Sequence, residues 1–248
     1  MIFDAYGFQF YYNDKLPKND TIINCKFSKN QELLEYNIKV GLVSVGAINF
    51  RKSYCKDSKV INAEIIGYTK GIGKLFFDLS ASYESYFADQ EYTPFKFIKS
   101  IYESGNKKRD EIYFNKKLKK AYYKNTKDSE RHFFFYENKL FDLVSGMYFF
   151  RSKIDKINND NTQFQIPYIH NGTGIKNLKF DFVGTEEIKV SNEFFKTKKF
   201  LSTFESKNKL FQNKNEIYLW VSDDQYNIPI VIETKTRLSK IKIVLKNE

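Results

Sequence analysis

The sequence contains few of the residues that build metal sites and catalytic centres. Its 248 residues include only two cysteines, Cys25 and Cys55, and two histidines, His132 and His170. A closed zinc site would have to gather all four from separate segments, without the short ligand spacing that such sites show. The two cysteines form either one disulfide or two buried free thiols. His132 has no nucleophile beside it and His170 falls in a polar loop, so we expect no metal, no cofactor and no catalytic centre.

Long hydrophobic runs are also missing. No apolar stretch approaches the roughly 18 residues of a membrane-spanning helix, so we expect no such helix. The first segment, Met1–Tyr12, has no basic start and contains Asp4, which is unlike a secretory signal peptide. Because 42% of the residues are hydrophobic and 18% aromatic, we nevertheless expect a folded core rather than a disordered chain.

Arginine is scarce although the chain is basic. The net charge is +11, yet only five of the 41 basic residues are arginines. Arginine supplies the forked donors that read guanine and grip phosphate, so we expect no nucleic-acid partner. The lysines accompany many Asn, Ile, Phe and Tyr residues, a composition typical of an A/T-rich genome. We therefore interpret most of the lysines as a solvated surface rather than as a binding patch.

Side chains alternate between apolar and polar along most of the chain. Leu34, Tyr36, Ile38 and Val40 alternate with polar residues, which is the pattern of a strand with one buried face. Further strands are expected at 43–50, 59–69, 75–87, 95–102, 111–114, 119–124, 164–169, 175–183, 185–190, 198–205, 216–222, 229–238 and 240–245. Short polar turns join them, so their neighbours run antiparallel. The pattern predicts a mainly β domain over 31–248, preceded by a loosely attached segment over 1–30. Its architecture is a large curved antiparallel sheet, a half-barrel or partly closed barrel.

One segment has helical periodicity. In 138–151 the apolar residues fall at 140, 143, 144, 147 and 148, which predicts one amphipathic helix. Asn138 is the expected N-cap. Gly146 inside the helix indicates a close approach of another part of the chain.

Two motifs, one rich in glycine and one rich in aspartate, are similar to ligand-binding loops. Both are better explained as turns. Gly71-Ile72-Gly73 is followed by an expected strand, so it is read as a turn rather than a phosphate-binding loop. Asp223 and Asp224 are adjacent and lack the spacing of a calcium loop. With Asn227 they are expected to form a hairpin turn.

The strands carry more aromatic residues than a sheet requires. Two interpretations stay open, since the rings either fill the core or line a concave apolar cavity for a lipid-like ligand. In the second case the helix would plug or cover the cavity. The candidate ligand-binding residues are Phe76, Phe77, Phe95, Phe97, Met147, Tyr148 and Trp220.

Several motifs resemble those of domain-of-unknown-function family 3108. They are Asp78–Tyr86 (DLSASYESY), Thr93–Ile98 (TPFKFI), Phe141–Arg151 (FDLVSGMYFFR), Leu219–Asp224 (LWVSDD) and Ile228–Glu233 (IPIVIE). Their order and spacing are similar to the family pattern over roughly residues 31–247. The pair around Trp-Val-Ser-Asp-Asp and Ile-Pro is the most specific element.

The resemblance implies a protein of the bacterial cell envelope or periplasm. Its fold would be similar to the Lol-type lipoprotein-carrier superfamily, which holds acyl chains between a half-barrel and helices. The family has no established activity. Our hypothesis is a non-enzymatic protein that binds a hydrophobic ligand, such as a lipid or lipoprotein acyl chain, in a concave sheet. The alternative is a structural or interaction module whose lysine-rich face meets anionic lipid at the membrane periphery, or a protein partner. The oligomeric state is left open.

Overall fold

A computed structural model describes residues 27–28, 32–125, 131–157, 163–169, 172, 174–205, 214–237 and 239–246. Fourteen strands within these residues form one antiparallel sheet whose two edges, β8 and β9, do not pair with each other. The predicted mainly β fold with a large antiparallel sheet is therefore confirmed, and the sheet is not closed into a barrel.

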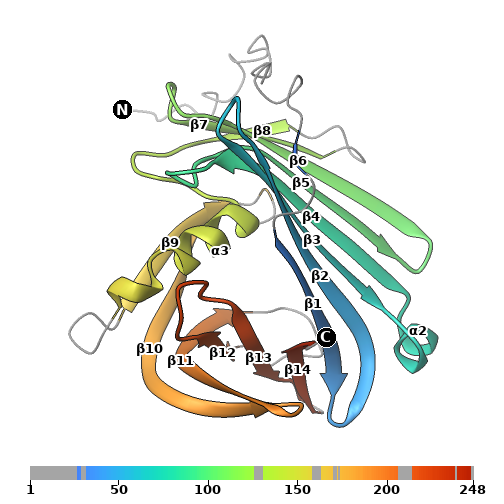
Figure 1. Cartoon of the computed structure of the whole chain (residues 1–248). Helices are drawn as coiled ribbons and strands as arrows, with labels where there is room; N and C mark the ends of the chain where they lie inside the picture. Colours follow the sequence, from blue (N-terminus) through green and yellow to red (C-terminus); the bar gives the residue numbers. More distant parts are fainter. Residues whose placement is uncertain are drawn as a thin grey trace, which may run out of the picture.

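The sheet consists of two arms that share one seam (Figure 1). The first arm contains β1 Glu32–Val40, β2 Val43–Cys55, β3 Val60–Thr69, β4 Leu79–Ala88, β5 Pro94–Glu103, β6 Asn106–Asn115, β7 Lys120–Asn125 and β8 Arg131–Phe135. The second arm contains β9 Gln163–Ile169, β10 Ile175–Val190, β11 Glu193–Glu205, β12 Lys214–Ser222, β13 Pro229–Lys235 and β14 Lys240–Leu245. Within each arm, strands that are consecutive in sequence pair side by side. The arms join where β1 pairs with β14.

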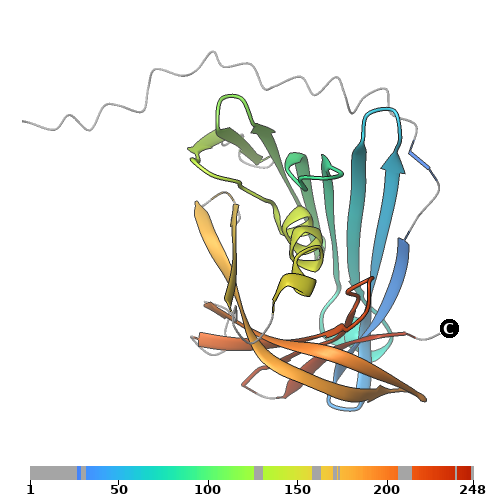
Figure 2. The ribbon, with the colours of Figure 1, turned by 60° about the vertical axis from the view of Figure 1, so that its left-hand side comes forward.

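A helix lies in the space between the two arms. Helix α3, Leu143–Arg151, is followed by a 3₁₀ turn at Ile154–Lys156 and lies between β8 and β9 in the sequence. Because these strands are the two edges of the sheet, the connection crosses the open side of the molecule, and α3 lies within the concavity (Figure 2). A shorter helix, α2 at Ile72–Phe76, joins β3 to β4. Neither helix approaches the length and apolar character that crossing a bilayer requires, and this holds for all the described residues.

The core divides into two clusters that α3 joins. The first-arm cluster is made of Ile61, Ala63, Phe87, Phe97, Ile112, Phe114, Ala121, Tyr123, Leu140, Val144, Tyr148 and Ile169. The second-arm cluster is made of Phe141, Phe150, Ile154, Ile157, Ile166, Phe180, Phe200 and Val221. Val144 and Tyr148 face the first arm, whereas Phe150 stacks on Phe180 of the second with ring centroids 4.0 Å apart. The helix therefore packs against both arms and connects their two cores.

The predicted helix is confirmed, but its predicted start is wrong. The N-cap is Asp142 rather than Asn138, and its carboxylate accepts hydrogen bonds from the backbone of Val144 and Ser145. The preceding residue is held in extended form, because Phe141 N donates to Pro167 O of β9 at 3.0 Å. The expected close contact at Gly146 is present, since a Cβ there would lie 3.2 Å from Ile166 Cγ2.

Other local predictions have mixed outcomes. The expected strand over 75–87 begins only at Leu79, because the segment after Gly71 forms α2. Strand β8 was not expected. The segments expected at 175–183 and 185–190, with a bulge between them at Gly184, form the single strand β10, and the expected bulge is confirmed by the register shift between Phe182 and Gly184. The expected turn at Asp224 is present, since its carboxylate accepts a hydrogen bond from Tyr226 N at 2.8 Å.

Part of the expected N-terminal segment contacts the first arm. Most of residues 1–30 lie outside the described residues, but Ser28 N donates to Tyr54 O of β2 at 3.0 Å. The neighbouring Cys55 is buried and disulfide-bonded. The sequence contains one other cysteine, Cys25, which lies outside the described residues. A disulfide, rather than two free thiols, is therefore the form the structure adopts.

Candidate functional site

The concave face of the first arm carries alternating aromatic and charged rows. Strand register sets Phe97 of β5 opposite Ile112 of β6, and the next inward pair is Lys99 opposite Asp110. Phe97 and Ile112 pack with Val144 of α3 in the first-arm cluster, so this face of the strands points toward the helix. Lys99 and Asp110 share that face because side chains two residues apart in a strand point the same way.

A cavity of about 260 Å³ lies between this face, the start of α3 and β9. Its lining residues are Tyr83, Phe97, Lys99, Asp110, Ile112, Tyr123, Leu143, Tyr168, Ile169 and Gly172. Most of these side chains are aromatic or aliphatic. An apolar cavity of about 150 Å³ is enough to hold benzene, so the space is large enough for part of an apolar molecule.

One side of the cavity is polar. Lys99 Nζ lies 4.0 Å from Asp110 Oδ2, and both side chains are largely buried. Tyr123 donates its hydroxyl hydrogen to Asp110 Oδ1 at 3.0 Å. Burial lowers the pKa of Lys99, and the charge of Asp110 opposes that shift. The cavity therefore combines ring surfaces with a cation, a carboxylate and a phenol, which suits a molecule with an apolar body and a polar end.

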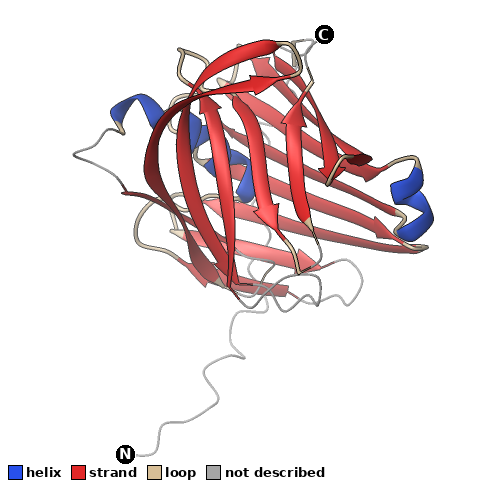
Figure 3. Cartoon of the chain, turned by 90° about the horizontal axis from the view of Figure 1, so that it is seen from below, coloured by secondary structure: helices blue, strands red, loops and turns tan. Residues whose placement is uncertain are grey.

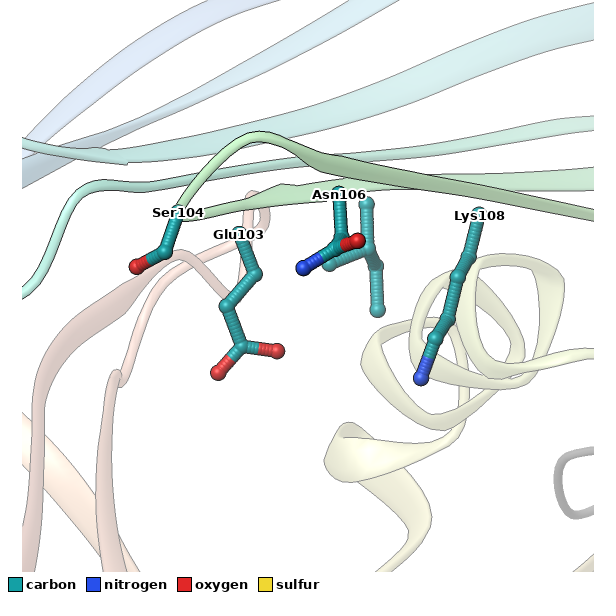
Figure 4. Close-up of a pocket in the computed structure, with 5 residues that line it drawn as sticks. Glu103, Ser104, Asn106 and Lys108 are labelled. Carbon is teal, nitrogen blue, oxygen red and sulfur yellow. The ribbon is translucent and has the colours of Figure 1, made fainter.

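A second, more polar cavity of about 430 Å³ follows along the same two strands. It is lined by Ile101, Glu103, Ser104, Asn106 and Lys108 at the β5–β6 hairpin, with α3 beyond them (Figure 4). Ile101 and Lys108 form the inward pair next to Lys99 and Asp110. The two cavities thus lie in series, from the start of α3 to the free end of the hairpin.

The N-terminus of α3 is fixed to the floor of the concavity. The Asp142 carboxylate caps the helix and also accepts a hydrogen bond from the Ser85 hydroxyl of β4 at 2.6 Å. Ser145 Oγ donates to the same carboxylate at 2.9 Å. Burial raises the pKa of Asp142 to about 6, although these hydrogen bonds act in the opposite direction. Such a buried cap fixes the position of Leu143, the next residue, at the wall of the first cavity.

The C-terminus of α3 is fixed to the seam between the arms. Arg151 donates two hydrogen bonds to the carboxylate of Glu32 in β1, both at 2.9 Å, and a third to Asn227 O at 3.0 Å. Tyr148 also donates its hydroxyl hydrogen to Glu32, at 2.9 Å. Burial would raise the pKa of Glu32, but Arg151, Lys52 and Tyr148 together lower it below its usual value. Both ends of the helix are therefore held by charged or polar contacts.

The structure brings part of the expected ligand-binding set to this site. Phe97 lines the first cavity. Met147 and Tyr148 pack in or against the first-arm cluster. Phe95 is half-buried and lines neither cavity described above.

Three expected site residues lie elsewhere. Phe76 and Phe77 are exposed at α2, because the chain there is helical and does not continue the inward alternation of β4. Trp220 is on the convex face of β12. Its neighbours Leu219 and Val221 pack in the second-arm cluster, whereas Trp220 Nε1 donates to Glu186 at 2.6 Å. Their placement in a concave cavity was wrong.

The polar side of the cavity is absent from the predicted ligand-binding set. Lys99 follows Phe97 by two residues, so alternation alone places it on the same face. Asp110 could be found only from the register of β5 with β6, which sets it opposite Lys99. Leu143 belongs to the predicted helical stripe, but it is not among the predicted ligand-binding residues.

Within the part of the chain that the structure describes, no three His, Cys, Asp or Glu side chains are grouped to hold a metal ion. His170 lies outside the described residues. His132 is exposed and stacks on Tyr123, with ring centroids 6.0 Å apart. The absence of a metal, cofactor and catalytic centre stays a prediction.

Comparisons with known proteins agree with this architecture. A family model described as "Protein of unknown function (DUF3108)" matches residues 35–246. No curated protein sequence matches the chain significantly. The structure is similar to a solved beta-barrel-like protein of domain of unknown function DUF1849 from Brucella abortus, with a TM-score of 0.57 and 8% identity. That match covers 90% of this chain and 98% of the other, and at this identity it shows the fold alone.

Proposed function

The chain belongs to the DUF3108 family of proteins of unknown function, and we propose that it is a non-enzymatic binding protein of the bacterial cell envelope. Its ligand is a small amphipathic molecule, such as a lipid or an acyl chain with a polar end. The apolar part occupies the cavity beside Leu143, and the polar end lies at Lys99 and Asp110.

The observation that carries this proposal is the composition of the cavity wall. Tyr83 and Phe97 form a stacked pair with ring centroids 6.4 Å apart, and they border the Lys99–Asp110 ion pair. Lys99, Asp110 and the Tyr123 hydroxyl form the polar end of a wall that otherwise consists mostly of rings and aliphatic side chains. Such a wall matches a molecule with an apolar body and a polar end.

The envelope part of the proposal is supported by the disulfide at Cys55. Structural disulfides persist in oxidising compartments, such as the bacterial periplasm, and are rare in the reducing cytosol. Cys55 is the last residue of β2, so the bond lies at the β2–β3 turn.

The test is a titration of delipidated protein with a fluorescent fatty-acyl probe. We expect saturable binding with one probe per chain. Leu143→Asp places a charge at the cavity wall without emptying the core, because Leu143 is 43% exposed, and we expect it to weaken binding about tenfold or more. Leu118→Asp is the matched control, since Leu118 is 59% exposed and lines neither cavity.

Lys99→Met tests the contribution of the polar end of the ligand separately from that of its apolar part. We expect it to weaken binding of an acyl probe with a carboxylate more than that of the corresponding alcohol, because only the carboxylate gains from the lysine charge. If wild-type protein shows no saturable binding, or if Leu143→Asp binds like Leu118→Asp, the proposal is wrong.

A further inference from the structure

Large apolar side chains are gathered at one end of the first arm and are exposed there. We call this surface the apolar tip, and it consists of Leu42, Val43, Ile72, Leu75, Phe76 and Phe77. Leu42 is 99% exposed, Leu75 84% and Phe76 83%. Single exposed apolar residues are normal on a soluble protein, but a group of six in two adjacent connections indicates an interaction surface.

The fold holds the two parts of the tip together. Lys70 N donates to Val45 O at 2.9 Å, which ties the start of the α2 connection to β2. Gly73 is buried against the same strand, and a Cβ there would lie only 2.1 Å from Val45 O. The small face of α2 is thus turned to the sheet, and its large side chains are turned away. Figures 1 and 3 show α2 at the ends of β3 and β4, far from α3.

Basic residues surround the tip. The β13–β14 turn lies beside the β1–β2 turn, since Gly41 N donates to Lys240 O at 3.2 Å. The basic residues of these connections and their flanking positions are Lys39, Lys70, Lys74, Lys235, Arg237 and Lys240. Two of the acidic residues near them are paired, Asp78 with Lys74 at 4.0 Å and Glu233 with Lys240 at 2.9 Å. The tip therefore combines exposed apolar side chains with a surplus of positive charge.

We propose that the apolar tip inserts into the headgroup region of a bilayer that contains anionic lipid. Apolar side chains on a projecting turn can enter the boundary between headgroups and acyl chains while the strands stay outside, and basic neighbours gain from negative headgroups. A second copy of the chain is a poorer occupant, because two identical tips would bring like charges together. This inference goes beyond the binding of a ligand, because no tip residue lines either cavity.

The tip also lies next to the polar cavity. Ser104 N, at the β5–β6 hairpin, donates to Asp78 O, directly after α2, at 3.0 Å. Ser104 lines the 430 Å³ cavity on the concave side of that hairpin (Figure 4). A bilayer in contact with the tip would therefore face the open end of the two cavities.

The test is flotation of the full chain with vesicles of phosphatidylcholine containing phosphatidylglycerol. We expect the wild type to float with these vesicles and to be released as salt is raised from about 0.1 M to about 1 M. The double variant Leu75→Ser/Phe76→Ser should bind about tenfold or more weakly, because the inserted side chains are removed. The matched control is Leu118→Ser/Phe194→Ser, which replaces the same residue types at 59% and 64% exposed positions outside the tip.

A second pair of variants tests the charge. Lys70→Gln/Lys74→Gln should weaken binding to the anionic vesicles and leave the small binding to pure phosphatidylcholine unchanged. The proposal is overturned if the wild type does not float, or if Leu75→Ser/Phe76→Ser floats like its control. It is also overturned if sedimentation shows a dimer that this variant abolishes, since a second copy would then cover the tip. The tip variant should still bind the fatty-acyl probe, so failure here is distinct from failure of the proposed function.

Discussion

The two helices of the described chain differ in how the protein holds them. Helix α3 has a complete capping box at Asp142 and a bidentate ion pair at Arg151, and its apolar side chains pack against both arms. Helix α2 has five residues, and no side chain among the described residues caps its first turn. Its Leu75 and Phe76 remain exposed.

The comparison shows that similar residues serve different purposes in the two helices. In α3 the apolar residues are buried against both arms. The position of the helix therefore sets the width of the cavity beside it. In α2 the apolar residues contribute little to the folded state, because they contact solvent rather than core. Substitutions of the buried residues of α3 should therefore change stability, whereas substitutions of the exposed Leu75 and Phe76 of α2 should change interactions only.

The largest expected effect follows from breaking the anchor of α3. Arg151→Met leaves the carboxylate of Glu32 without its main partner in a largely buried place, and the loss of one partner of such a pair destabilises by about 3–5 kcal/mol. Urea denaturation followed by circular dichroism measures the change. Lys74→Met is the counterpart in α2, where the pair with Asp78 is exposed and should contribute at most about 0.5 kcal/mol. Equal effects of the two substitutions would contradict the comparison.

A smaller effect is expected from the pH dependence of the α3 cap. The pKa of Asp142 is raised from 3.8 to about 6 in the folded protein, so between these values the folded state binds more protons than the unfolded state. Stability from this group is therefore present at low pH and is lost as pH rises toward 6. Relative to Asp142→Asn, the wild type should gain about 1–3 kcal/mol as pH falls from about 6 to about 4.

The quantity to measure is the difference in unfolding free energy between the two proteins at each pH. Taking this difference cancels the contribution of Glu32, which changes with pH in the direction opposite to that of Asp142. The pKa of Glu32 is lowered in the folded protein, so this group stabilises the fold above about pH 4.5 and loses that effect as the pH falls. A constant difference over this range would show that Asp142 does not titrate as the structure indicates.

The smallest effect is expected at the tip. Leu75→Ser/Phe76→Ser should change the unfolding free energy by no more than about 0.5 kcal/mol, because both side chains are already exposed. Thermal unfolding of the variant beside the wild type checks this. A large loss of stability would mean that these side chains pack in the fold, and α2 would then resemble α3.

The same difference explains which helix could be predicted from the sequence. The apolar positions of α3 repeat with helical spacing, so the helix was expected. Its start was misplaced because Phe141 pairs with β9, a contact that sequence spacing does not contain. Helix α2 depends on Gly73 fitting against Val45, which is a tertiary contact. From the sequence alone its aromatic residues looked like the start of a strand.

The site was predictable to a similar degree. Alternation along β5 correctly placed Phe97 on the concave face, and it also implied Lys99. The partner Asp110 and the wall residue Leu143 come from other elements, and only strand register and the position of α3 bring them together. Trp220 was misplaced because alternation gives two faces and does not state which one is concave.

The most direct test of the account distinguishes the cavity from the tip as the place of an acyl chain. A fatty acid with a photoreactive diazirine would be bound to the delipidated protein without vesicles, irradiated, and located by mass spectrometry of peptides. The account predicts labelling of the segments that contain Tyr83, Phe97 and Leu143. Labelling of the segment with Leu75 and Phe76 instead would contradict it, because the ligand would then bind the surface that we assign to the bilayer.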